Sequence, residues 1–366
     1  MKTVIVIGAG ATRAEAESQK ASRAQRPPLD GDFFELAQIR EELAPHRERV
    51  QAFVKKHFDI DVFQSPRPGM EQIFAHVYSS TSIRPLAPGV KEVFSSLCRI
   101  YAKVIEESTN WIKPTTKGPL CRLIRKVVST GETTIITFNQ DIVIEKVLDA
   151  LTAANCPVSW ELDQGYKLPF ASITSPKAAS ELDKEKYFVP RSSQIPINPI
   201  LLKPHGSLNW YAKTLKKDSV LSQLKPSHKI NCTRRKELAT TMQFTSANDS
   251  GRKTWYTWPI IVPPILEKGN FLGNALDSVW DECWRALTSA ERVIVYGYSF
   301  PAADAQSRTF FKRASVQMAN RPMLVTINPD LQSSLRAAEI FKPAAHISCD
   351  TVRTYLSAEV RNGIVI

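Results

Sequence analysis

The sequence predicts an α/β fold: a Rossmann-like parallel sheet with helices on both faces and a helical insertion after the first strand. Short β-branched runs alternate with longer amphipathic segments, an order typical of parallel sheets covered by helices. The first run, Thr3 to Ile7, is continuously apolar and enters a glycine turn, as a buried parallel strand does. The 366 residues are 43% hydrophobic and 23% charged, which is the balance of a globular protein.

Each later element follows from its own pattern. We expect a mobile loop over 11–31, because these residues are small, polar or basic. We expect helix over 32–58, interrupted at Pro45. Apolar periodicity or flanking stop signals predict further helices over 88–107, 120–128, 142–154, 272–289, 303–318 and 331–341. Short apolar runs predict strands over 133–137, 200–202, 260–262, 293–296 and 323–327.

The same patterns divide the chain into regions. We assign 1–31 and 129–348 to a Rossmann-like core, and 32–128 to a helical insertion or subdomain. Residues 211–257 are expected to form a basic, irregular insertion in the core, and 349–366 a C-terminal tail.

The charge balance favours polyanionic partners. Lysine and arginine number 48 against 36 acidic residues, a formal net charge of +12. Residues 211–236 hold eight of these cations and one acid. This stretch is interpreted either as a solvated loop, or as a surface that contacts nucleic acid or an acidic partner.

The cysteines and apolar runs exclude other classes. None of the six cysteines forms a C-x-x-C pair, so we expect no zinc or other metal site and mostly buried thiols. No apolar run reaches 18 residues, and the short N-terminal run does not fit a signal peptide. We therefore expect a cytoplasmic protein without membrane contact.

Small or polar residues follow the predicted strands, where ligands of open parallel sheets bind. Gly8-Ala9-Gly10-Ala11 forms a G-x-G turn that can approach a pyrophosphate, or is simply a tight turn. Asn139 and Asp141 can hold a ribose hydroxyl, a water or a carboxamide, or cap the following helix. His205 is a general base or a structural histidine. The other strand ends are Gly297-Tyr298-Ser299 and Asn328-Pro329-Asp330.

In this order, these motifs resemble the NAD-binding core of the sirtuin family. That family has a G-A-G turn, then a Pro/Asp/Phe element, Asn-x-Asp, His-Gly-Ser and Gly-x-Ser loops, and a late Asn. The Pro/Asp/Phe element corresponds loosely to 27–33. The deacylases of the family also carry a zinc module with two C-x-x-C pairs, which this chain lacks. In the stretch Lys203-Pro204-His205-Gly206-Ser207-Leu208-Asn209-Trp210 and in Pro263-Pro264, the chain instead resembles the zinc-free sirtuin-like NAD hydrolases of bacterial antiphage defence.

The resemblance implies a role for each matched residue, with NAD as the substrate. Asp141 would hold the carboxamide, Asn139 would position water or ribose, and His205 would act as base. Asp32 and Phe33 would wall the nicotinamide pocket. The pyrophosphate would lie against the glycine turn and the loop after the fifth predicted strand, and the adenosine ribose against a late asparagine: Gly8, Ala9, Gly10, Ala11, Gly297, Ser299 and Asn328.

The resemblance also implies a setting for the chemistry. Such enzymes deplete NAD and halt an infected cell, form homo-oligomers, and in some cases work with a separate HerA-type ATPase. The chain is thus expected to be an NAD+ glycohydrolase of abortive infection. The alternatives are a nucleic-acid-binding or nuclease effector on a Rossmann-like scaffold, and an NAD-dependent deacylase or ADP-ribosyltransferase.

Overall fold

The main sheet confirms the predicted fold class. A computed structural model describes residues 1–83, 86–161, 165–167, 171–173, 196–214, 230–233, 245–247, 253–256, 259–265, 276–301 and 304–361. Its six-stranded sheet has the order β11-β10-β9-β1-β2-β4, and every neighbouring pair is parallel. The strands are β1 (Lys2–Ile7), β2 (Glu132–Thr137), β4 (Ile200–Leu202), β9 (Arg292–Tyr296), β10 (Met323–Ile327) and β11 (Ala345–Cys349).

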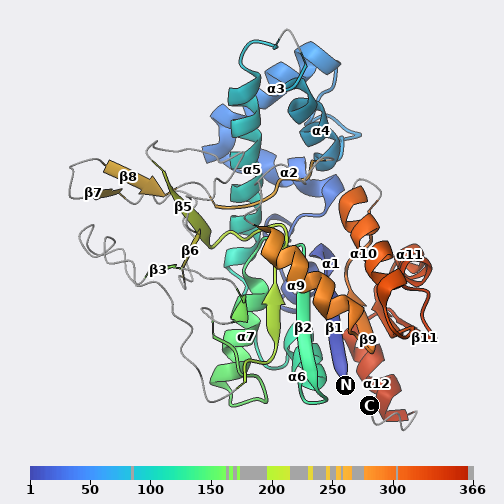
Figure 1. The fold of residues 1–366 in the computed structure, drawn as a ribbon. Coiled ribbons are helices and arrows are strands. Elements are labelled where there is room, and N and C mark those ends of the chain that lie inside the picture. The colour runs from blue at the N-terminus through green and yellow to red at the C-terminus, as the bar shows by residue number, and fades with distance from the viewer. Residues whose placement is uncertain are drawn as a thin grey trace.

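Helices cover both faces because the chain reverses its direction of winding at β1 (Figure 1). From β1 the chain moves to β2 and β4, whereas from β9 it moves the opposite way to β10 and β11. Right-handed crossovers therefore place their helices on opposite faces. One group of helices is α1 (Ala9–Ser18), α6 (Pro119–Val128), α7 (Val143–Ala153) and α12 (Val352–Arg361), and the other is α9 (Asp277–Thr288), α10 (Ala305–Gln317) and α11 (Leu331–Phe341).

Four of the helices between β1 and β2 extend beyond the carboxyl ends of the strands (Figure 1). They are α2 (Phe33–Gln38), α3 (Ala44–Phe58), α4 (Met70–Ser80) and α5 (Val90–Asn110). The expected interruption of α-helix falls over 39–43, just before Pro45, and Pro45 itself lies in the first turn of α3, where its missing N–H costs no hydrogen bond. Phe33, Phe74 and Phe94 are buried where α2 and α4 pack on α5.

A second sheet accounts for part of the expected basic insertion. Strands β3 (Ala171–Ile173), β5 (Trp210–Thr214), β6 (Ile230–Thr233), β7 (Thr245–Ala247) and β8 (Lys253–Tyr256) pair in the order β3-β6-β5-β8-β7. The described parts of 211–257 are thus strands rather than irregular chain. The rest of this insertion, including most of 211–236, lies outside the described residues.

Three other expectations need correction. Residues 9–18 form helix α1, not the start of a mobile loop. The expected strand over 260–262 is an isolated bridge between Ile261 and Gly206. The expected tail includes α12, in which Val352 and Tyr355 are buried. Among the described helices, none has the length and apolar character needed to cross a bilayer.

Candidate functional site

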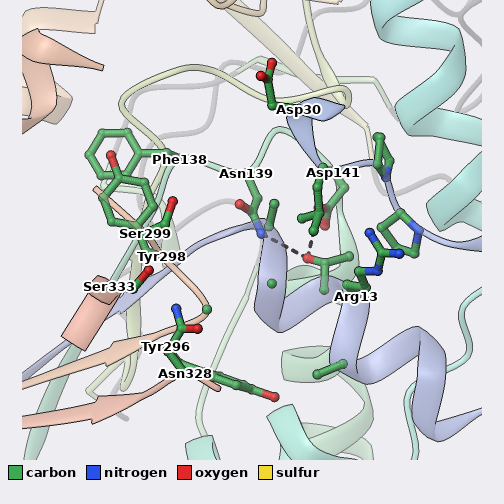
Figure 2. A pocket seen from close by; sticks show the side chains of 18 of the residues that line it. Arg13, Asp30, Phe138, Asn139, Asp141, Tyr296, Tyr298, Ser299, Asn328 and Ser333 are labelled. Atoms are coloured by element: carbon green, nitrogen blue, oxygen red, sulfur yellow. Dashed lines mark hydrogen bonds between the residues drawn. The ribbon is translucent and has the colours of Figure 1, made fainter. Parts of the chain in front are cut away.

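A cavity of about 1190 Å³ opens at the carboxyl ends of the parallel strands (Figure 2). It lies at the point where the two directions of winding separate, which is where open α/β sheets bind ligands. Loops after β1, β2, β4, β9 and β10 all contribute to its wall. The predicted site residues that line it are Ala9, Gly10, Phe33, Asn139, Asp141, His205, Gly297, Ser299 and Asn328.

Three glycines allow the first turn of α1 to pack directly on the loop after β9. A Cβ atom on Gly8 would lie 2.5 Å from the Gly297 carbonyl oxygen, and one on Gly10 would lie 2.9 Å from it. Gly297 has a φ of +61° and would place a Cβ atom 2.2 Å from the Ala11 nitrogen. The Gly10 amide donates to the Gly297 carbonyl at 3.0 Å. Close packing therefore already requires glycine at these positions, whatever ligand binds.

Thr12 joins the two polar residues of the loop after β2. The Asn139 Nδ2 group donates to the Gly8 carbonyl and to the Thr12 hydroxyl, both at 2.9 Å. The Thr12 hydroxyl in turn donates to Asp141 Oδ2 at 3.1 Å, and the shared contacts are drawn in Figure 2. Both amide hydrogens of Asn139, which lines the cavity, are used, so this side chain can bind a further group only as an acceptor, through Oδ1.

Asp141 is buried, and it lines the cavity just before the start of a helix. Its Oδ1 accepts the Val143 amide at 2.9 Å in the first turn of α7. Burial raises the pKa of Asp141 above its ordinary value of 3.8, against the opposing effects of the Lys203 ammonium and the Val143 amide. The N-cap of α7 is Ile142, with no side-chain cap, so Asp141 lines the cavity beside the start of the helix and is not its cap.

Main-chain hydrogen bonds hold the loop that carries His205. The His205 carbonyl accepts the Val262 amide at 2.9 Å, and the Ser207 amide donates to the Ile260 carbonyl at 2.9 Å. Gly206 between them has a φ of +78°, and a Cβ atom there would lie 2.2 Å from the Ile260 oxygen. The backbone positions the imidazole independently of its side-chain contacts.

Aromatic rings surround the imidazole. The Phe138 ring meets the His205 ring edge-on at 4.8 Å between centroids and stacks on Tyr298 at 5.2 Å. The Tyr298 hydroxyl donates to Asp304 at 2.9 Å, and burial raises the pKa of this tyrosine. In Figure 2 the Phe138 and Tyr298 rings lie beside each other on the side of the cavity where Ser299 lies. This wall suits an uncharged planar group.

The far wall of the cavity is polar. Asn328 Oδ1 accepts the Asp330 amide at 3.0 Å. Asp330 caps α11 by accepting the Gln332 and Ser333 amides, and the Ser333 hydroxyl lowers its pKa most. Arg336 donates to the Ser299 carbonyl at 2.8 Å and so joins the loops after β9 and β10. Side chains here offer hydrogen bonds to a sugar or to phosphate.

Some predicted residues do not reach the cavity. Gly8 and Ala11 lie behind its wall, in the packed turn. Asp32 points to Arg13, whose guanidinium it binds at 2.6 Å, and also accepts the Leu29 amide. Its neighbour Asp30 lines the cavity instead, in the position drawn in Figure 2.

Several other residues at the site are not among those predicted from sequence. Thr12 and Arg13 fall in the expected loop, although they follow the G-A-G turn directly. Tyr101 lines the cavity from α5, where its helical spacing indicates only packing. Lys203 is fully buried beneath the His205 loop, and no sequence pattern distinguishes it from a surface lysine.

Within the described residues, no three His, Cys, Asp or Glu side chains gather as metal ligands do. Five cysteines there are free thiols: Cys98, Cys121, Cys156, Cys283 and Cys349.

Comparisons with known proteins identify little beyond this geometry. No family model and no curated protein sequence matches the chain. Among solved structures, it is similar to one described under "Structural Basis for the Mechanism and Regulation of Sir2 Enzymes", with 12% sequence identity and a TM-score of 0.41. The match covers 98% of this chain and 92% of the other.

Proposed function

We propose that this chain is an NAD+ glycohydrolase, which cleaves the bond between nicotinamide and ribose to release nicotinamide and ADP-ribose. One observation carries the proposal: Asn139, Asp141 and His205, which come from two separate loops, line the same cavity as Ser299 and Asn328. The volume of about 1190 Å³ exceeds that of most drug-sized ligand sites and suits a dinucleotide.

Cleavage of the bond between nicotinamide and ribose needs no general acid from the protein. The C–N bond breaks with its electron pair on the pyridinium nitrogen, so nicotinamide leaves uncharged and needs no acid. Water then forms the new bond to the ribose carbon and loses one proton. The protein must hold the carboxamide, position the water and accept that proton.

The described contacts fit these three tasks. Asn139 presents an acceptor oxygen because Gly8 and Thr12 bind its amide donors, so it can position water or a ribose hydroxyl. Asp141 can accept from the carboxamide. His205, beside the Phe138 ring, is the proposed base, and general base catalysis contributes about 10²–10⁴-fold.

The proposed activity also implies a cellular role and a means of control. Consumption of NAD by a free-running hydrolase would stop growth, which fits abortive infection and requires restraint until a trigger arrives. We therefore propose a cytoplasmic homo-oligomer that is controlled by a partner such as a HerA-type ATPase. The insertion 32–128 and the basic stretch 211–236 are the proposed contact surfaces, the latter also for nucleic acid.

Purified chain incubated with NAD tests the activity, alone and with DNA or an ATPase partner, by chromatography of nicotinamide and ADP-ribose. We expect equal amounts of the two products, and their loss in Asn139→Ala and His205→Ala. His57→Ala is the matched control, because His57 is exposed on α3 and does not line the cavity. Full activity without Asn139 or His205 would refute the assigned site.

The products also separate the alternatives. Transfer of ADP-ribose to a protein, or to an acyl group from acyl-lysine, would indicate a transferase or deacylase. Salt-dependent retention of DNA without release of nicotinamide would indicate a nucleic-acid-binding or nuclease effector.

A further inference from the structure

A buried lysine joins the two loops that carry the polar residues of the cavity. Lys203 is 0% exposed, and its ammonium donates to the Asp141 carbonyl oxygen at 2.5 Å and to Glu145 Oε1 at 2.8 Å. It precedes His205 by two residues. One side chain from the His205 loop therefore binds the main chain of the Asn139–Asp141 loop.

The counter-ion belongs to the same assembly. Glu145 lies in the first turn of α7 and is 4% exposed. Its Oε1 also accepts the Tyr166 hydroxyl at 2.5 Å, whereas its Oε2 has no hydrogen-bond partner among the described residues. A buried ion pair adds little stability compared with apolar side chains of similar volume. Its presence here calls for an explanation other than stability.

We infer that Lys203 is a positioning residue, which fixes the distance between the imidazole of His205 and the polar side chains of Asn139 and Asp141. We call the hydrogen bond from Lys203 to the Asp141 carbonyl the tether. The inference rests on the proposed function, because it gives the tether a role in the same reaction. Lys203 lies behind the cavity wall and so touches no reacting atom. Displacement by about 1 Å at a reacting centre can cost 10²-fold in rate, so a rigid link between the two loops has a clear use.

The pair Lys203→Met/Glu145→Gln separates the tether from the burial of charge. Lys203→Met alone would leave the buried Glu145 side chain without its counter-ion, and such a chain can fail to fold. Glu145→Gln alone also removes a counter-ion, but it keeps both hydrogen-bond acceptors of Lys203, namely the Asp141 carbonyl and an amide oxygen at position 145, so it is the tolerable single variant. In the double variant the charges are gone and the Tyr166 hydroxyl still has an amide partner, but the link to Asp141 is lost. Comparison of the double variant with Glu145→Gln therefore measures the link.

We expect the double variant to fold and to lose about 10²-fold in kcat relative to Glu145→Gln, with a much smaller change in KM. Arg292→Met is the matched control. Arg292 is a buried cation at the amino end of β9, far from the cavity along the strands, where it donates to Thr3 and Thr130. Its replacement should lower the melting temperature without lowering kcat.

Hydrogen exchange measured by mass spectrometry over residues 137–143 gives a readout that does not need turnover. Exchange in this segment should be faster in the double variant than in Glu145→Gln, and unchanged in Arg292→Met. Absence of nicotinamide release by the unmodified chain would refute the proposed function. In that case hydrogen exchange over 137–143 would still test whether Lys203 holds the Asn139–Asp141 loop. Equal kcat or equal exchange in the double variant and Glu145→Gln would overturn the inference.

Discussion

The two loops that face each other across the cavity are held by different means. The Asn139–Asp141 loop is held by side chains, through Thr12, the amide of Asn139 and the ammonium of Lys203. The His205 loop is held mainly by main-chain hydrogen bonds to 260–262 and by a glycine with positive φ, and the Gln140 side chain also donates to the His205 carbonyl. Replacing the imidazole of His205 should therefore leave its loop in place, whereas replacing Thr12 should disturb the structure of the first loop.

The largest effect should come from replacing the imidazole. His205→Gln removes the proposed base and keeps the main chain that positions it, so kcat should fall by about 10²–10⁴-fold. Binding of ADP-ribose, measured by calorimetry, should change little. If affinity fell as far as turnover, the side chain would be holding the loop, and the contrast between the loops would be wrong.

Gly206→Ala should weaken the main-chain hydrogen bonds between the His205 loop and 260–262. The φ of +78° and the approach of Ile260 leave no room for a methyl group, and such strain costs about 1–3 kcal/mol. Thermal unfolding measures the loss. Gly31→Ala is the control, because a Cβ atom there would meet no heavy atom of the described residues within 4 Å. A Gly206 variant as stable as the Gly31 variant would contradict the prediction.

Thr12→Val should remove the hydrogen bonds by which the Thr12 side chain holds the Asn139–Asp141 loop. The hydroxyl links Asn139 and Asp141 inside a buried site, and leaving buried polar partners without it costs about 1–3 kcal/mol. Both the free energy of unfolding and kcat should fall. Thr12→Ser keeps the hydroxyl and should keep most of both, which denaturant titration and the nicotinamide assay can check.

The smallest effect concerns Glu15, in the same helix as Thr12. Burial raises the pKa of Glu15 above 4.5, although the Leu120 amide and Gln19 oppose this. Such a carboxyl binds more protons folded than unfolded, so its contribution is fully present below the unfolded pKa and is lost as pH rises through the folded pKa. Glu15→Gln keeps an acceptor for Leu120 and removes this dependence. Unfolding measured between pH 4 and 8 should show a flatter profile, with a change of about 1 kcal/mol or less.

The sheet can be predicted from sequence, but part of the site cannot. Apolar β-branched runs identify β1 and β9 because both are buried on two faces. Helix α1 escapes prediction because its buried residues, Ala11, Thr12, Glu15 and Ala16, form no apolar stripe. Only the first turn, which includes Ala11, packs closely on the glycine-rich loop after β9, whereas the buried Glu15 accepts the Leu120 amide. Lys203 escapes prediction because only the fold reveals that its ammonium is buried beside Glu145.

The reversal of winding at β1 has a consequence for cooperativity. Loops after β1, β2 and β4 and loops after β9 and β10 line one cavity, although they belong to halves of the sheet that join only along β1 and β9. A dinucleotide bound there would be released when either half melts, so it would protect both halves equally. At a hundredfold excess over Kd this protection is about 2.7 kcal/mol, and it would make the two halves unfold in one step.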